Sequence, residues 1–334
     1  MKETSAALVI ASALAVVAFS ASPASAACGA VTIANMNWVS AELAAYVDKF
    51  ILENGYQCSV ELVPGDTMPT TTSMAEKGEP DIAPEIWMNS VRQVINRAVE
   101  EGRLEIAGEI LSGGGEEGWW IPRYMVDEHP ELTTLEAVLK RPDLFPNPED
   151  SSRGALHNCP SGWNCQIITD NLYKAFEVAN AGFDLIDTGS PAGLDGSIAK
   201  AYSRKEGWFG YYWAPTAILG KYDMVKLDMG VGHSPEEWDR CTGQGGCADP
   251  KKNDWTKSVV MTVTSASFRE KAPEAFEYLS KRSWSNQVVN SMLAYMDENL
   301  AGGEEAAEKF LKEHEDVWTQ WVPGDIAKKI RAAL

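Results

Sequence analysis

The sequence predicts an α/β protein with two lobes, each an open sheet flanked by helices, and a ligand site in the cleft between them. Strand-like and helix-like segments alternate from residue 31 onward, which is typical of open, largely parallel sheets. The chain has 334 residues, and a single hydrophobic core rarely serves so many, so two lobes are expected.

The first predicted unit is strand, helix, strand, over residues 31–34, 40–54 and 58–63. Ser40 is expected to cap the helix and Gly55 to end it. Apolar residues recur at helical spacing within it, namely Leu43, Val47, Phe50 and Ile51. A further helix near 72–77, a third strand at 81–83 and an amphipathic helix from about 90 to 101 follow.

The alternation of strands and helices is interrupted at the glycine run 113–115. Residues 118–124 then predict an extended segment that crosses into a second lobe. Beyond it we expect helices at 132–140, 167–179 and 194–203, a buried strand at 207–213, and a mostly helical stretch from 274. The expected division is 27–118 for the first part of lobe 1, 119–217 for lobe 2, and 218–334 for the return to lobe 1.

Residues 1–26 predict a secretory signal peptide, which implies export to the periplasm. An apolar run from Ala6 to Phe19 is too short to span a bilayer, and Ala24 and Ala26 supply the small-x-small cleavage pattern. Lipidation of the nearby Cys28 is the alternative. It is disfavoured because the leucine usual three positions before such a cysteine is missing.

Six cysteines follow the predicted cleavage site, and an even number in an exported chain favours disulfides. The short spacings from Cys159 to Cys165 and from Cys241 to Cys247 indicate two local loops, which leaves Cys28 to pair with Cys58. Zinc is disfavoured because there is no Cys-x-x-Cys and only four histidines are present.

The charge balance excludes some partners. Lysine and arginine number 29 against 48 aspartates and glutamates, for a formal net charge of −19. Nucleic acid and anionic lipid are bound through basic surface, so neither is expected as a partner.

Common catalytic signatures are absent, including the nucleophile elbow, His-Glu-x-x-His, the phosphate loop and the EF-hand loop. We therefore expect no enzyme and no cofactor. A pair of catalytic carboxylates, as in some glycosidases, is the remaining enzymatic interpretation, since Glu85, Glu116 and Glu117 lie near aromatic residues. Glu116 and Glu117 beside a glycine run are more typical of a solvated loop.

The segment 239–254 carries three aspartates and a predicted disulfide. Carboxylate oxygens are ligands that calcium takes, so a structural calcium ion is one interpretation. An exposed acidic loop is the interpretation that we favour.

The chain has twelve tryptophans, and several fall at predicted strand ends. Trp38 and Trp87 follow strands of the first lobe, Trp119 and Trp120 open the second lobe, and Trp213 closes its last strand. Strand ends are where an α/β cleft collects its ligand contacts, although any one of these rings alone is more typical of core packing.

Indole faces attract a cation such as a methylated ammonium, which cannot hydrogen-bond. Each ring contributes roughly 0.5–2 kcal/mol. Three or four rings plus apolar burial therefore suffice for the ~8 kcal/mol of micromolar binding.

Five segments carry a family resemblance, and they stand in the family's order and spacing: Asn37–Ser40, Pro80–Trp87, Gly118–Tyr124, Gly189-Ser190 and Tyr211–Thr216. They resemble the glycine betaine, choline and proline betaine substrate-binding proteins of ABC importers. Within that family the chain is most similar to the trimethylamine N-oxide binding proteins of marine bacteria. The resemblance covers about residues 30–320.

The resemblance implies a type II periplasmic-binding-protein fold, no enzymatic activity, and a monomer that delivers its ligand to an ABC permease in the inner membrane. It places a trimethylammonium group in a box of Trp38, Trp87, Trp119 or Trp120, and Trp213. Neighbouring side chains on a strand point to opposite faces, so only one of Trp119 and Trp120 is expected to face the cleft, and we favour Trp119.

Glu85 and Ser40 bear on ligand choice. Ser40 replaces an aspartate that receives the choline hydroxyl in choline receptors. Glu85, two residues before Trp87, would repel a betaine carboxylate, so it favours trimethylamine N-oxide, whose oxygen can take a shared proton, or choline. A helix N-terminal acid is the alternative role for Glu85. The predicted function is a trimethylamine N-oxide receptor, with a choline or glycine betaine receptor and a secreted glycan-active hydrolase as alternatives.

Overall fold

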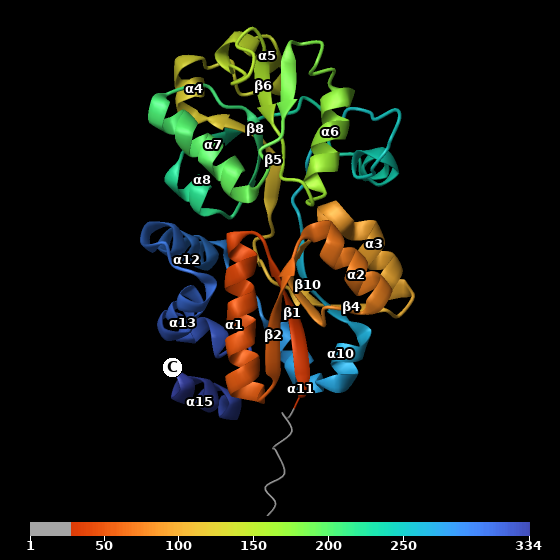
Figure 1. Cartoon of the computed structure of the whole chain (residues 1–334), viewed down its shortest axis with the longest axis vertical. Helices are drawn as coiled ribbons and strands as arrows, with labels where there is room; N and C mark the ends of the chain where they lie inside the picture. The colour runs from red at the N-terminus through yellow and green to blue at the C-terminus, as the bar shows by residue number, and fades with distance from the viewer. Residues whose placement is uncertain (1–27) are drawn as a thin grey trace, which may run out of the picture.

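The computed structural model describes residues 28–334. In this part of the chain, two five-stranded sheets form the cores of two lobes that are stacked along the long axis of the molecule (Figure 1). Helices flank both sheets, so the predicted two-lobed α/β architecture is confirmed. The predicted signal peptide, residues 1–26, lies outside the described residues.

The first sheet has the strand order β2-β1-β3-β10-β4. As predicted, β1 runs parallel to β2, with Ala30 opposite Ser59, and β3 joins the other side of β1 in the same direction. β10 is antiparallel to both of its neighbours. The strands are β1 (Ala30–Met36), β2 (Ser59–Gly65), β3 (Ile82–Trp87), β4 (Leu104–Glu109) and β10 (Val260–Ser265).

Helices on two sides cover this first sheet (Figure 1). They are α1 (Val39–Tyr56), α2 (Thr67–Lys77), α3 (Met88–Glu100), α10 (Ala266–Lys271), α11 (Pro273–Lys281), α12 (Asn286–Asn299), α13 (Gly303–Glu313), α14 (Glu315–Trp318) and α15 (Gly324–Ala333). The helix α1 ends one residue after Gly55, and Gln57 rather than Gly55 adopts the left-handed conformation. Gly55 instead lets α15 approach, because a Cβ there would lie 2.8 Å from a side-chain carbon of Ile326.

The second sheet has the order β7-β6-β8-β5-β9. Its strands are β5 (Glu116–Pro122), β6 (Gly154–His157), β7 (Phe183–Ile186), β8 (Gly210–Ala214) and β9 (Met224–Lys226). Its helices are α4 (Arg123–Glu128), α5 (Leu135–Leu139), α6 (Cys165–Ala175), α7 (Pro191–Arg204), α8 (Ala217–Lys221) and α9 (Pro235–Glu237), with a 3₁₀ turn η1 (Pro142–Leu144) and a π-helical turn η2 (Trp238–Thr242).

The sequence predicted that the chain returns to the first lobe at residue 218. In the structure it returns later. The strand β9 pairs with β5 and so belongs to the second sheet. The return is at the start of β10, where Gly115 and Ser258 of the two crossing segments exchange backbone hydrogen bonds of 2.7 and 2.8 Å. This pair marks the place where the lobes are joined.

All three predicted disulfide pairs are present: Cys28–Cys58, Cys159–Cys165 and Cys241–Cys247. Between residues 28 and 334, no helix combines the length and the apolar character that crossing a membrane requires.

Candidate functional site

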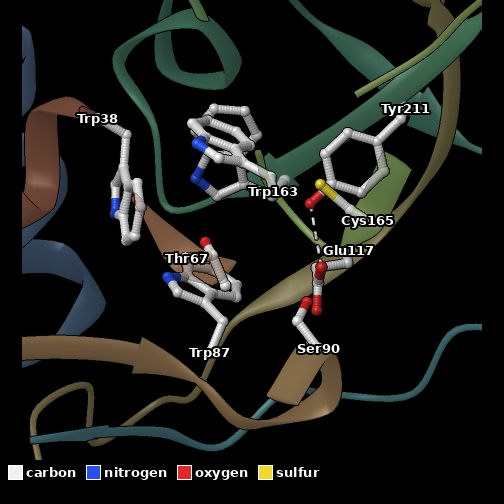
Figure 2. A pocket seen from close by; sticks show the side chains of 9 residues that line it. Trp38, Thr67, Trp87, Ser90, Glu117, Trp163, Cys165 and Tyr211 are labelled. Atoms are coloured by element: carbon white, nitrogen blue, oxygen red, sulfur yellow. Dashed lines mark hydrogen bonds between the residues drawn. The ribbon is translucent and has the colours of Figure 1, made fainter. Parts of the chain in front are cut away.

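A pocket lies between the lobes at the ends of strands from both sheets, and Figure 2 shows its side chains. It contains about 310 Å³ of empty space, part of which is open to solvent. Its lining residues are Trp38, Thr67, Trp87, Ser90, Glu117, Trp163, Cys165, Tyr211 and Trp213.

The first wall of the pocket consists of two indoles from lobe 1. Trp38 is the extended residue that precedes α1, two positions after β1 ends, and Trp87 is the last residue of β3. Both rings are held at positions that the predicted strand ends indicated. Gly115 makes room for one of them, because a Cβ there would lie 2.0 Å from the Trp87 ring.

Glu85 connects these two indoles from behind. Its Oε1 accepts hydrogen bonds from Trp38 Nε1 at 2.7 Å, Trp87 Nε1 at 3.0 Å and Ser40 Oγ at 2.8 Å. Burial raises the pKa of this carboxyl, and the three donors and Arg282 partly oppose the rise. Glu85 is fully buried in β3 and does not line the pocket.

The structure differs from two predictions, those for the roles of Glu85 and Ser40. Glu85 is a strand residue rather than a helix N-terminal acid, and it contacts the rings rather than the pocket space. Ser40 does not cap α1, because its hydroxyl donates to Glu85 instead. The hydrogen bonds to Glu85 therefore fix the orientation of the Trp38 and Trp87 indoles.

The second wall consists of three rings from lobe 2. Trp163 packs edge-on against Trp213, with ring centroids 5.0 Å apart, and Tyr211 lies 6.2 Å from Trp213. Trp163 also meets Trp38 of the first wall edge-on at 5.4 Å. Rings from both lobes therefore converge on one space.

Sequence reasoning missed Trp163. It follows β6 within the loop closed by Cys159 and Cys165. The signal was available, since a tryptophan inside a short disulfide loop after a strand end follows the same rule as Trp38. None of the five segments that carry the family resemblance contains residue 163.

Trp119 and Trp120 do not line the pocket. Trp119 is fully buried and packs against Phe209 at 5.6 Å and Phe176 at 6.4 Å in the core of lobe 2. Trp120 donates its Nε1 hydrogen to the Tyr212 carbonyl at 3.0 Å. The expectation that one of the two faces the cleft is corrected accordingly. Of the expected cage, the structure brings together Trp38, Trp87 and Trp213, with Trp163 and Tyr211 added.

Glu117 lines the pocket, whereas the sequence favoured a solvated loop for Glu116 and Glu117. Of the two, only Glu116 is exposed; Glu117, the second residue of β5 in the second sheet, has 1% of its surface accessible. Tyr211 donates its hydroxyl hydrogen to Glu117 Oε1 at 3.0 Å. Glu117 Oε2 has no hydrogen-bond partner among residues 28–334.

The proton affinity of Glu117 is unusual. Burial raises its pKa from an ordinary 4.5 to about 7, although the Tyr211 hydroxyl, Lys226 and two nearby polar side chains oppose the shift. A carboxyl with this pKa exchanges its proton near neutrality. The protonated carboxyl can therefore donate a hydrogen bond below pH 7, and the ionised carboxylate can accept one above it.

The electrostatics of the lining suit a cation with a small polar atom. None of the nine lining residues is basic, and five present aromatic faces, each worth roughly 0.5–2 kcal/mol to a cation. Glu117 supplies the polar group. A ligand carboxylate would find no basic partner on these walls.

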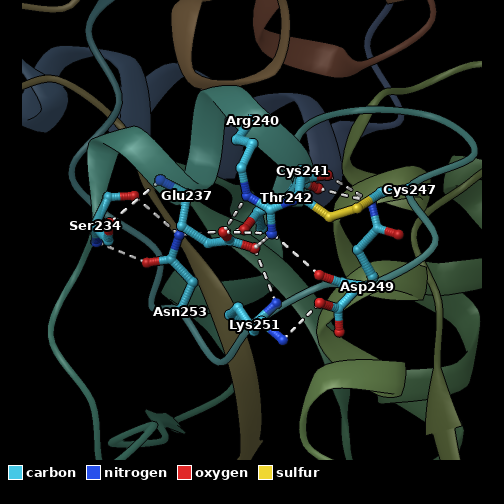
Figure 3. Close-up of polar contacts among 10 residues, drawn as sticks. Ser234, Glu237, Arg240, Cys241, Thr242, Cys247, Asp249, Lys251 and Asn253 are labelled. Atoms are coloured by element: carbon cyan, nitrogen blue, oxygen red, sulfur yellow. Dashed lines mark hydrogen bonds and ion pairs between the residues drawn. A yellow bond between two sulfur atoms is a disulfide. The ribbon is translucent and has the colours of Figure 1, made fainter.

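In the segment around the Cys241–Cys247 disulfide, two carboxylates form ion pairs with basic side chains (Figure 3). Asp249 pairs with Lys251 at 2.6 Å, and Glu237 pairs with Arg240 at 2.7 Å, so these carboxylates are already neutralised. No group of three or more potential metal ligands occurs within the part of the chain that the structure describes.

Comparisons with known proteins agree with this geometry. A family model described as the substrate-binding domain of ABC-type glycine betaine transport systems matches residues 29–313. Among curated proteins, the trimethylamine N-oxide-binding protein of Pelagibacter ubique is 24% identical over 86% of this chain and 89% of its own length. A glycine betaine/carnitine transport binding protein of Listeria monocytogenes is 21% identical over 49% of this chain and 47% of its own.

Solved structures share the fold. The choline-binding protein of an ABC transporter, in complex with choline, has a TM-score of 0.70 and 20% identity, covering 92% of this chain and 98% of that one. The glycine betaine/L-proline-binding protein ProX of Borrelia burgdorferi also has a TM-score of 0.70, with 16% identity, covering 90% and 99%.

Proposed function

The chain belongs to the family of substrate-binding domains of ABC-type glycine betaine transport systems, and from this premise we propose that it is a periplasmic receptor for trimethylamine N-oxide. Members of the family bind solutes and are not enzymes. We expect the protein to act as a monomer and to pass its ligand to an ABC permease in the inner membrane. The predicted signal peptide supports the location, and the Pelagibacter ubique relative supports the ligand.

One observation carries the choice of ligand: a buried carboxyl with a free oxygen and a pKa of about 7 lines an otherwise aromatic pocket. The three methyl groups of trimethylamine N-oxide would lie against the indole faces, where a methylated cationic nitrogen is favoured. Its oxygen is a strong acceptor and would take the proton of Glu117. A protonated carboxyl therefore supplies the one hydrogen bond that this ligand needs.

Glycine betaine fits these walls less well. Its carboxylate needs a basic side chain or several backbone donors, and the pocket lining contains no lysine or arginine. An ionised Glu117 would repel it, and a neutral Glu117 offers a single donor.

Choline is the second candidate, because Glu117 can also serve it. Choline carries a hydroxyl group that donates a hydrogen bond, and the ionised carboxylate of Glu117 accepts one. The choline complex among the structural neighbours shares the fold. The two ligands therefore require opposite protonation states of the same residue.

The test is calorimetric titration of the mature protein with trimethylamine N-oxide, choline, glycine betaine, carnitine and a few oligosaccharides at pH 6.5. We expect trimethylamine N-oxide to bind most tightly, at micromolar Kd or below. Tightest binding of glycine betaine would overturn the ligand choice. Saturable binding of a sugar alone would overturn the receptor assignment in favour of a glycan-active protein.

A further inference from the structure

The disulfide Cys159–Cys165 closes a small ring at the boundary between the two lobes. The ring lies between β6 and α6 of the second lobe, with a sequence separation of 6 between its cysteines. Both cysteines are buried, and Cys165 itself lines the pocket. The third disulfide loop, Cys241–Cys247, also reaches lobe 1, since Gln244 Nε2 donates to Gln93 Oε1 at 3.0 Å.

Three consecutive residues inside the ring each bond to lobe 1. Trp163 Nε1 donates to Asn37 Oδ1 at 2.7 Å, Asn164 Nδ2 donates to the Ser90 carbonyl, and the Gly162 carbonyl accepts from Met68 N at 3.2 Å. The partners follow β1, open α2 and lie in α3. The disulfide ring therefore bonds to three segments of lobe 1 that border the pocket: the residues after β1, the start of α2 and the start of α3.

Gly162 shows how closely the ring approaches lobe 1. Its φ is +95°, a conformation that favours glycine. A Cβ at this position would lie 2.3 Å from Asp66 Oδ2, which is closer than side-chain atoms approach. Any larger residue would hold the ring away from α2.

We propose that the Cys159–Cys165 ring is a preformed clasp that closes lobe 2 over the bound ligand and presents Trp163 to it. A free loop would lose conformational entropy when it docks on lobe 1, whereas a ring constrained by a disulfide has already lost most of it. The disulfide thus contributes to ligand affinity and not only to folding. This inference rests on the proposed binding of a methylated amine.

The contacts also specify which rate constant responds. In the proposed clasp, these bonds form as the lobes meet around the ligand, so weakening them is expected to speed release more than it slows association. A role confined to folding would change the stability of the ligand-free protein and leave both rate constants alone.

The experiment compares two double variants, Cys159→Ser with Cys165→Ser and Cys28→Ser with Cys58→Ser, by stopped-flow tryptophan fluorescence with trimethylamine N-oxide. We expect the first pair to raise koff at least tenfold with kon within threefold. The second pair closes a loop within lobe 1, between β1 and β2, and is expected to leave both rate constants within twofold. An equal koff in the Cys159→Ser, Cys165→Ser double variant and in the unaltered protein would overturn the clasp.

A single substitution tests the same contacts with the disulfide intact, should the double variant fold poorly. Gly162→Ala brings a Cβ against Asp66 and is expected to raise koff about tenfold. Gly230→Ala is the matched control, because Gly230 also has a positive φ, +71°, but has nothing within 4 Å of its added Cβ. An identical koff for both glycine variants would overturn the proposal.

The proposed function and the clasp fail in different ways. If the unaltered protein binds trimethylamine N-oxide and the ring variants bind it equally, only the clasp is wrong. If the unaltered protein binds choline instead, the same rate comparison is made with choline, and the expected ratios for the clasp are unchanged. If it binds neither methylated amine, the proposed function and the clasp, which depends on it, are both overturned.

Discussion

Two buried glutamates, one in each sheet, are related to the aromatic pocket in different ways: Glu85 bonds to two of its indoles, whereas Glu117 lines it. Glu85 Oε1 accepts three hydrogen bonds, two of them from indoles that line the pocket. Glu117 Oε1 accepts one, and the Oε2 atoms of both glutamates lack a hydrogen-bond partner among residues 28–334. Burial raises the pKa of both. The difference teaches that the same residue type positions the rings in one sheet and is left available to the ligand in the other.

The largest expected effect is on stability. The pKa of Glu117 rises from 4.5 to about 7 on folding, so the native state binds the proton more tightly than the unfolded chain. The stabilisation is complete below pH 4.5 and is lost as the pH rises through 7. At 1.36 kcal/mol per pKa unit, the loss amounts to roughly 3 kcal/mol.

We therefore expect Glu117→Gln to be more stable than the unaltered protein at pH 8 by up to about 3 kcal/mol, and to lose this advantage at pH 4.5. Urea denaturation at the two pH values measures the difference. Glu116→Gln is the control for this comparison, because the neighbouring Glu116 side chain is exposed and its substitution should change the free energy of unfolding little at either pH. A pH-independent difference for Glu117→Gln would contradict the assignment.

Glu85→Ala should produce the next largest effect. Removing the carboxyl leaves two indole N–H groups and one hydroxyl without their acceptor, and frees the two indoles of the first wall to rotate. We expect ligand affinity to fall about 100-fold, or ~2.7 kcal/mol, as measured by calorimetry. A loss below threefold would show that packing alone orients Trp38 and Trp87.

Substituting single tryptophans of the pocket should have smaller effects on ligand affinity. Trp87→Ala and Trp213→Ala are each expected to weaken binding at least tenfold, about 1.4 kcal/mol, and the phenylalanine variants should lose less because an aromatic face remains. Equal losses for alanine and phenylalanine would indicate a packing role.

Matched controls come from tryptophans remote from the pocket. Trp284 packs against Phe310 at 5.3 Å, and Trp318 donates to the Leu311 carbonyl at 2.8 Å, both within lobe 1. Their alanine variants should lose stability and keep affinity. Trp255 is not a clean control, because it packs against Tyr211 at 5.3 Å directly behind the pocket wall.

Periodicity and strand-end position were enough to predict much of this molecule. The parallel unit at β1 and β2, the three disulfides, and the placement of Trp38, Trp87 and Trp213 at the pocket all follow from local pattern. Each of these features depends on residues close in sequence or on a rule about where strands end.

The failures involve contacts between segments distant in sequence. Alternation along a strand shows that Trp119 and Trp120 face opposite sides, but both sides are covered, one by Phe209 and the other by the Tyr212 carbonyl. The local sequence predicts a solvated Glu117, because its neighbours are glycines and Glu116. Its burial comes from Tyr211, 94 residues away, and no local pattern encodes such a contact.

The pH dependence of affinity for two ligands, measured with Glu117→Gln and Glu85→Gln beside the unaltered protein, tests the division of roles most directly. We expect the affinity for trimethylamine N-oxide to fall about tenfold from pH 6 to pH 8 as Glu117 loses the proton that the N-oxide shares. The affinity for choline should rise over the same interval. Glu117→Gln should flatten both profiles, and Glu85→Gln should weaken binding while both slopes remain. Unchanged slopes in Glu117→Gln would contradict the account.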